Sequence, residues 1–116
     1  MSETWHTLID AAEFPAEGKL AARIAGWFVL VAHDDDGWHA VNDRCTHQAA
    51  LLSKGRIRRG AIMCPLHGAR FEVATGACIG GAYPGLRTFP VRVVDGRVEV
   101  CVPDAAPGIE EVPVVI

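Results

Sequence analysis

The sequence predicts an all-β protein, a small antiparallel β-sandwich or barrel. Apolar residues occur in short runs that turn residues interrupt every eight to twelve positions, and no segment keeps the three-and-four spacing of an amphipathic helix. Half of the 116 residues are apolar and 22% are charged, which excludes a disordered or fibrous chain. This length suffices for one core and leaves little room for another, so we expect a single domain over residues 1–116.

The candidate strands are short and follow one another along the chain. Asp34-Asp35-Asp36-Gly37 and Asp95-Gly96 each lie between two apolar runs and predict tight hairpins. Residues 55–62 predict a smaller hairpin, with Ile57 and Ile62 facing inward and the arginines in water. The expected strands cover residues 5–9, 19–24, 27–32, 38–42, 62–64, 87–93 and 98–102.

Two segments lack a strand pattern. Glycine is dense around Pro84 between residues 75 and 85, which predicts an irregular loop whose backbone closely approaches another group. The tail after Pro103 loses its pattern, and we expect it to be partly extended.

The net charge and the absence of long apolar stretches indicate which partners and compartments to expect. A formal net charge of -3 gives no reason to expect nucleic acid, which is bound by an excess of Lys and Arg. The start of the chain has no basic leader with an apolar run, and no stretch reaches membrane-spanning length, so we expect a cytoplasmic protein with no membrane partner. In that reducing compartment, the four cysteines are expected to be thiols or metal ligands.

Two compact Cys/His pairs carry the chemistry. Cys45-Thr46-His47 and Cys64-Pro65-Leu66-His67 are separated by sixteen residues, and each stands where a strand gives way to a loop. Thiolate and imidazole ligands suit zinc, iron, copper and iron-sulfur clusters, so residue type leaves several metals possible. Zinc fingers usually pair cysteine with cysteine and histidine with histidine beside a helix, whereas here each pair is mixed and no helix is evident.

Mixed pairs on two facing loops can send one ligand from each loop to each of two metals. Both cysteines then bind one iron and both histidines the other, which is the geometry of a Rieske centre. The chain resembles the Rieske ferredoxin family in this C-T-H…C-P-L-H-G pattern and in the continuation Gly68-Ala69-Arg70-Phe71-Glu72…Thr75-Gly76. The resemblance extends over roughly residues 5–102. It implies one [2Fe-2S] cluster in a subdomain of about residues 42–71 at one end of the sandwich, ligated by Cys45, His47, Cys64 and His67.

Departures from the family pattern bear on the reduction potential. Ala50 and Leu66 stand where respiratory-type Rieske proteins have two cysteines that form a disulfide. Ala69 and Phe71 stand where the high-potential branch has serine and tyrosine hydroxyls that donate to cluster sulfurs. Because such donors stabilise the reduced state, we expect a potential at the low end of the Rieske range of roughly -150 to +300 mV.

The resemblance also implies a function. The chain is similar to the ferredoxin component of bacterial aromatic-ring dioxygenase systems. Such a protein is no enzyme itself. It carries single electrons from a flavin-containing reductase to a terminal oxygenase in aromatic hydrocarbon catabolism, and here we expect a monomer whose partners dock transiently near His47 and His67.

Three alternative functions share some of these features. A terminal oxygenase needs a further domain with a two-histidine, one-carboxylate iron site, and we expect none in a chain that ends at Ile116. The small subunit of an assimilatory nitrite reductase resembles Rieske domains in fold but generally lacks the four ligands. A structural module that holds one zinc with the same four residues is the alternative from a different class.

The remaining candidate groups receive simpler interpretations. Cys78 and Cys101 are assigned to packing, and His6, His33 and His39 receive no function. The basic stretch of Lys54, Arg56, Arg58 and Arg59 is interpreted as the solvated side of a hairpin. Tyr83-Pro84-Gly85 is either a third loop at the cluster or an ordinary surface turn.

Overall fold

The computed structural model describes residues 2–66 and 68–114, and it confirms the all-β prediction. Every strand pair is antiparallel. No helix in this part of the chain is long and apolar enough to cross a membrane. Short 3-10 turns are η1 (Ala11–Glu13), η2 (Leu52–Lys54) and η3 (Ile109–Glu111). The strands are β1 (Glu3–Asp10), β2 (Lys19–Ile24), β3 (Trp27–Asp34), β4 (Gly37–Asn42), β5 (Ile57–Arg58), β6 (Ala61–Met63), β7 (Arg70–Glu72), β8 (Thr88–Phe89), β9 (Val91–Val94) and β10 (Arg97–Pro103).

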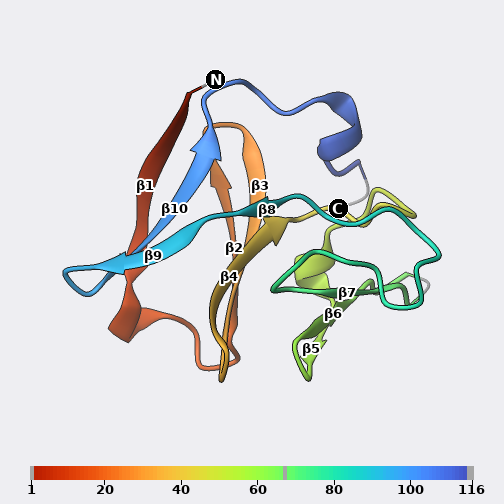
Figure 1. Ribbon diagram of the computed structural model, residues 1–116, viewed down its shortest axis with the longest axis horizontal. Coiled ribbons are helices and arrows are strands. Elements are labelled where there is room, and N and C mark those ends of the chain that lie inside the picture. The colour runs from red at the N-terminus through yellow and green to blue at the C-terminus, as the bar shows by residue number, and fades with distance from the viewer. Residues whose placement is uncertain (1, 67, 115–116) are drawn as a thin grey trace.

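Two of the three sheets form a sandwich. Their strand orders are β1-β10-β9 and β2-β3-β4-β8, and the third sheet, β5-β6-β7, lies beside them at the cluster-binding end that the sequence predicts (Figure 1). The sandwich core lies between the first two sheets. Its buried members are Ile24, Trp27, Val29, Val31, Ala40, Phe89, Val98, Val100 and Val102.

Strand β3 is buried on both faces, which explains its nearly unbroken apolar sequence. Val29 and Val31 enter the sandwich core, whereas Leu30 and Ala32 enter a second core. This second core lies between the sandwich and the third sheet. Its buried members are Leu30, Ala32, Val41, Cys45, Ala50, Leu52, Ile62, Cys64, Phe71, Val73 and Leu86.

The expected strand over residues 87–93 is divided by Pro90 into β8 and β9. Proline has no N–H for a strand ladder, and the chain changes sheets at this point. The Pro90 carbonyl still accepts a hydrogen bond from the Cys101 N–H at 3.0 Å. The sequence therefore located the β segment correctly but missed its break, and it also missed the three-residue strand β7.

The predicted hairpins are present. Asp95 and Gly96 both have positive φ, as a two-residue hairpin turn of type I′ requires, and Arg59 and Gly60 repeat this conformation between β5 and β6. Ile57 pairs with Ile62, which is fully buried. The arginines of this small hairpin are exposed, as expected.

The glycine-dense segment is irregular, and its close approach is to the chain's own backbone. A Cβ atom on Gly76 would lie 2.3 Å from the Leu86 carbonyl oxygen, and the Leu86 N–H donates to the Gly76 carbonyl at 2.7 Å. The tail is only partly extended, as expected, because it turns through η3 before Val114 reaches Ala49. Near its start, the Trp27 indole N–H donates to the carbonyls of Pro103 and Ala105.

Candidate metal centre

The two Cys/His pairs lie on loops that are closed in the same way. In the first Cys/His loop, residues 45–50, the Cys45 N–H donates to the Ala50 carbonyl at 2.9 Å. In the second Cys/His loop, residues 64–69, the Cys64 N–H donates to the Ala69 carbonyl at 2.7 Å. The fifth residue of each loop has positive φ, +24° at Ala49 and +77° at Gly68. The two loops therefore share the same closing hydrogen bond, between their first and sixth residues, and the same position of the positive φ.

The structure brings the thiols of Cys45 and Cys64 together. Both are buried, at 0% and 2% exposure, both are free of disulfides, and the two side chains lie close enough for Cys64 to affect the pKa of Cys45. Burial raises the pKa of the Cys45 thiol and the neighbouring Cys64 raises it further, while backbone N–H groups of Gln48 and His47 act in the opposite direction. Burial therefore disfavours the Cys45 thiolate, and a bound cation would stabilise it.

His47 lies at the exposed surface of the first Cys/His loop. Its ring stacks on Tyr83, with ring centroids 4.1 Å apart and planes inclined by 14°. The Thr46 hydroxyl donates to the Pro84 carbonyl at 2.6 Å. Tyr83-Pro84-Gly85 therefore packs against this loop, which favours a third loop at the site over an ordinary surface turn.

The remaining predicted ligand, His67, lies outside the described residues. Within residues 2–66 and 68–114, no three or more His, Cys, Asp and Glu side chains are grouped so as to hold a single metal ion.

The buried side chain of Asp43 links the segment before the first Cys/His loop to the segment after it. The Asp43 side chain accepts the Ser53 N–H at 2.7 Å, and Lys19 donates to the Ser53 carbonyl at the same distance. Burial raises the pKa of Asp43, while hydrogen bonds from Ser53 and Leu52 and the charge of Lys19 partly oppose the shift. The strand β4 that leads into the loop is thereby connected to η2.

The C-terminal tail also contacts the first Cys/His loop and the residues just before it. The Val114 N–H donates to the Ala49 carbonyl at 2.9 Å, and the Asn42 amide donates to the Glu111 carbonyl at 2.9 Å. Arg87 forms an ion pair with the Glu111 carboxylate at 2.6 Å. Arg44 also donates to the backbone carbonyl of Glu110. Sequence reasoning missed these contacts because they join residues far apart in a segment with no recognisable pattern.

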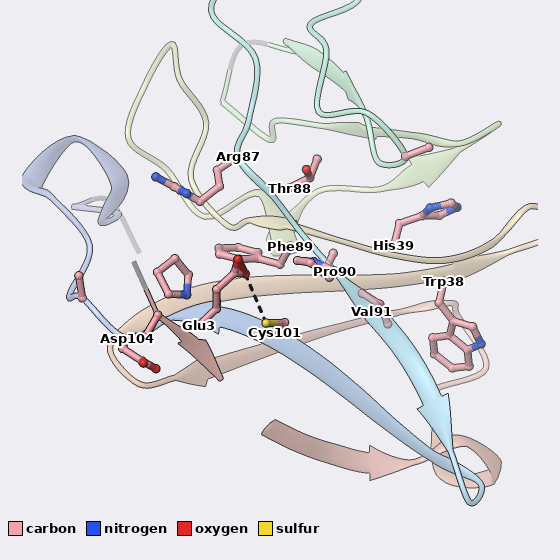
Figure 2. A pocket seen from close by; sticks show the side chains of 15 residues that line it. Glu3, Trp38, His39, Arg87, Thr88, Phe89, Pro90, Val91, Cys101 and Asp104 are labelled. Carbon is pink, nitrogen blue, oxygen red and sulfur yellow. Dashed lines mark hydrogen bonds between the residues drawn. The ribbon is translucent and has the colours of Figure 1, made fainter. Parts of the chain in front are cut away.

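The other two cysteines differ: Cys78 serves packing, as expected, whereas Cys101 does not pack in either core. Cys78 is half-buried against the second core and pairs with Phe71 through an isolated bridge. Cys101 is buried but does not belong to either core; its thiol donates to the Glu3 carboxylate at 3.4 Å in a groove of about 800 Å³ (Figure 2). Burial and the adjacent Glu3 raise the pKa of the Cys101 thiol, which keeps it protonated and unreactive.

The described residues fit an iron-sulfur cluster. Two thiols face one another in an apolar core, backbone N–H groups point at one sulfur, and an imidazole lies outward at the surface. N–H donors directed at sulfur stabilise the negative charge of ligated thiolates. The same donor types also bind zinc, so geometry alone does not choose between the two.

Comparisons with known proteins make that choice. The Rieske [2Fe-2S] domain family matches residues 4–90. The chain is 41% identical over 99 residues to the anthranilate 1,2-dioxygenase ferredoxin subunit of Burkholderia cepacia, covering 83% of this chain and 90% of that protein.

Solved structures agree with this family. The ferredoxin of carbazole 1,9a-dioxygenase from Nocardioides aromaticivorans IC177 superposes with a TM-score of 0.77 at 28% identity, over 90% of this chain and 99% of that chain. A ferredoxin-length chain from a complex of reduced oxygenase and oxidized ferredoxin in carbazole 1,9a-dioxygenase superposes with a TM-score of 0.74 at 30% identity, over 82% and 99%. This chain belongs to the Rieske [2Fe-2S] domain family, whose cofactor is one Rieske-type [2Fe-2S] cluster.

Proposed function

We propose that this chain is a Rieske ferredoxin that carries single electrons from a flavin-dependent reductase to a terminal oxygenase acting on aromatic rings. The observation that carries the proposal is the pair of equivalent Cys/His loops, which meet at buried Cys45 and Cys64 beneath exposed His47. Relatives of nearly the same length are named as ferredoxin subunits of dioxygenase systems, which supports an electron carrier and not an enzyme. The protein acts as a single-domain monomer in the cytoplasm.

The ligand assignment follows the two loops. Cys45 and Cys64 would hold one iron of the cluster, and His47 and His67 would hold the other. When bound, the cluster accepts and releases one electron at a time. The second core excludes water from the two cysteine sulfurs, and the His47 and Gln48 N–H groups offset the negative charge on Cys45. The exposed imidazole of His47 gives a short route to a docked partner, and Tyr83 stacks on its ring and fixes its orientation.

The potential of this carrier is at the low end for Rieske centres. Ala69 packs against the second core and Phe71 is fully buried within it, so neither position offers a hydroxyl to the cluster. Installing Ala69→Ser and Phe71→Tyr should raise the midpoint potential, each by roughly 60 mV, because one charge-assisted hydrogen bond contributes about 1.4 kcal/mol to the reduced state. Protein-film voltammetry measures this change. An unchanged or lower potential in the double variant would mean that missing hydroxyls do not set the potential.

Reconstitution tests the function itself. The purified protein is mixed with the reductase and oxygenase components of the Burkholderia cepacia anthranilate dioxygenase system, in place of that system's own ferredoxin. Hydroxylated product should form only when this protein is present, and the protein alone should convert no anthranilate. A cluster that dithionite reduces but that exchanges no electron with either component would contradict the proposed role.

A further inference from the structure

Positive charge is concentrated in the part of the chain that carries the cluster. Residues 44–71 contain six basic residues and no Asp or Glu, whereas the rest of the chain contains five basic and fourteen acidic residues. The first segment therefore carries a charge of +6, although the whole protein carries -3. An asymmetry of this size produces a positive potential on one side of an acidic molecule.

Four of these basic residues lie together on the solvent side of the third sheet. Because Ile62 and Phe71 face the second core, their strand neighbours point to water. Met63 pairs with Arg70 and Ala61 with Arg58 across this outer side. We define the basic face as Arg56, Arg58, Arg59, Arg70, Met63 and Ile79, which line a groove of about 380 Å³.

The four arginines have no carboxylate partners among the described residues. Elsewhere in the molecule, Arg87 and Arg92 form close ion pairs with glutamates. Glu72, the nearest acidic residue in the third sheet, accepts a hydrogen bond from Thr75. Arg59 also borders Asp34, Asp35 and Asp36, with which it lines a neighbouring groove. The guanidinium groups of Arg56, Arg58 and Arg70 are thus the ones most available to an external anion.

The basic face also exposes two apolar side chains. Met63 and Ile79 are each 40% exposed; Met63 lies between Arg56 and Arg70, and Ile79 lies beside Arg70. Exposed apolar side chains interspersed with arginine are typical of a protein–protein interface, in which Arg and Met are enriched. A nucleic acid or a lipid surface would use the charges but would gain less from these two side chains.

The basic face borders the second Cys/His loop. Met63 directly precedes Cys64, and Arg70 directly follows Ala69. The Met63 sulfur lies against Gly68, since a Cβ atom built there would be 3.9 Å from it. A molecule seated on this face is therefore next to the cluster-binding loops.

We propose that the basic face is the docking surface for a carboxylate-rich surface of an electron-transfer partner protein. This rests on the proposed function and specifies the chemistry of its partner. It replaces the interpretation of Arg56, Arg58 and Arg59 as a merely solvated hairpin. The arginines steer the acidic partner and set its orientation, and Met63 and Ile79 supply apolar contact between and beside them.

The test compares two double variants with the same change in net charge. Arg58→Glu with Arg70→Glu alters the basic face; Arg23→Glu with Arg97→Glu alters exposed positions on β2 and β10 and is the matched control. Stopped-flow absorbance follows one-electron oxidation of the dithionite-reduced protein by hexacyanoferrate(III), an anion, or by tris(phenanthroline)cobalt(III), a cation. In each case one electron passes from the protein to the metal complex, whose metal ion is reduced from the +3 to the +2 state.

Wild-type protein should react with the anion more slowly as salt is added, on the order of fivefold between about 20 mM and about 500 mM ionic strength, because screening removes the attraction. The basic-face variant should lose this dependence, and the control should retain most of it. Equal effects of the two double variants, or an anion rate that rises with salt in the wild type, would overturn the proposal. A protein that dithionite cannot reduce, or that transfers an electron to neither oxidant, would instead contradict the proposed function.

Competitors in the same assay identify the class of partner. The probes are a peptide of alternating glutamate and leucine, its glutamine counterpart, duplex DNA, and vesicles of phosphatidylcholine with phosphatidylserine. Only the glutamate peptide should slow the anion reaction strongly, in the wild type and in the control but not in the basic-face variant. Stronger inhibition by DNA or by the vesicles than by the glutamate peptide would overturn the proposal of a protein partner. It would indicate that the basic face binds a nucleic acid or a membrane.

Discussion

The two Cys/His loops have the same closing hydrogen bond but different supports. The first loop is held by segments distant in sequence, through Pro84 on the glycine-rich loop and Val114 on the tail. The second loop is held by its own flanking strands, where Met63 pairs with Arg70. One half of the site therefore depends on tertiary contacts and the other on a local hairpin. Changes in the tail should act on the His47 side alone, whereas changes beside β6 should act on the Cys64 side.

The largest effect should come from the feature that the two loops share. Cys45→Ser and Cys64→Ser each remove a thiolate from the buried pair, so iron bound per chain should fall at least roughly tenfold in either variant. Iron analysis after anaerobic purification measures this, and Cys78→Ser, which alters a half-buried thiol outside the pair, is the control. Normal iron content in either variant would show that the substituted cysteine is not a ligand of the cluster.

The second loop should be most sensitive at Gly55. A Cβ atom there would lie 1.8 Å from the Met63 carbonyl oxygen, so Gly55→Ala must displace β6 immediately before Cys64. We expect a loss of about 2–4 kcal/mol in the free energy of unfolding. Gly80→Ala, where a Cβ atom meets open space at positive φ, should lose only about 1 kcal/mol. Equal losses in denaturant titrations would show that the contact with β6 is unimportant.

The first loop should respond to loss of a single N–H on the tail. Val114→Pro removes the donor to the Ala49 carbonyl, whereas Val114→Ala keeps it. The proline variant should lose about 0.5–1.5 kcal/mol of stability and release iron faster to a chelator. If the alanine variant releases iron as fast as the proline variant, then the Val114 side chain and not its hydrogen bond holds the loop.

The smallest effect should be a pH dependence at Asp43. Its pKa in the folded protein is raised above the ordinary value of 3.8, so the neutral form is favoured by folding. The resulting stability is fully present below pH 3.8 and is lost as pH rises through the folded pKa. Asp43→Asn is always neutral, so its free energy of unfolding should increase relative to wild type between pH 4 and pH 7. A difference that stays constant or moves the other way would contradict this direction.

The same contrast between local and tertiary structure explains what the sequence could predict. Strand β2, the hairpin turns and the two Cys/His loops follow from short-range patterns, and each appears where expected. Strand β7 was missed because three residues are too few for a periodicity. Pro90 broke a strand that apolar pattern alone made continuous.

Long-range features of the site could not be read from the sequence in the same way. A third loop at the site, formed by Tyr83-Pro84-Gly85, was one of two open interpretations, and neither the stacking of Tyr83 on His47 nor the tail's bonds to the first Cys/His loop had a signal in the sequence. Such contacts depend on how the cores pack and not on neighbouring residues. The basic stretch was visible in the sequence, but Arg70 and Ile79 join it only in the folded sheet.

The proposed electron-carrier function requires a Rieske cluster in these two loops. Electron paramagnetic resonance of the dithionite-reduced protein, with iron and acid-labile sulfide analysis, is the measurement that tests it. We predict a rhombic signal with the low average g of mixed histidine and cysteine ligation, equal amounts of iron and sulfide, and an altered spectrum with a lower potential in His47→Cys and His67→Cys. An iron-free, silent, zinc-containing sample, or unaltered spectra in both histidine variants, would contradict it.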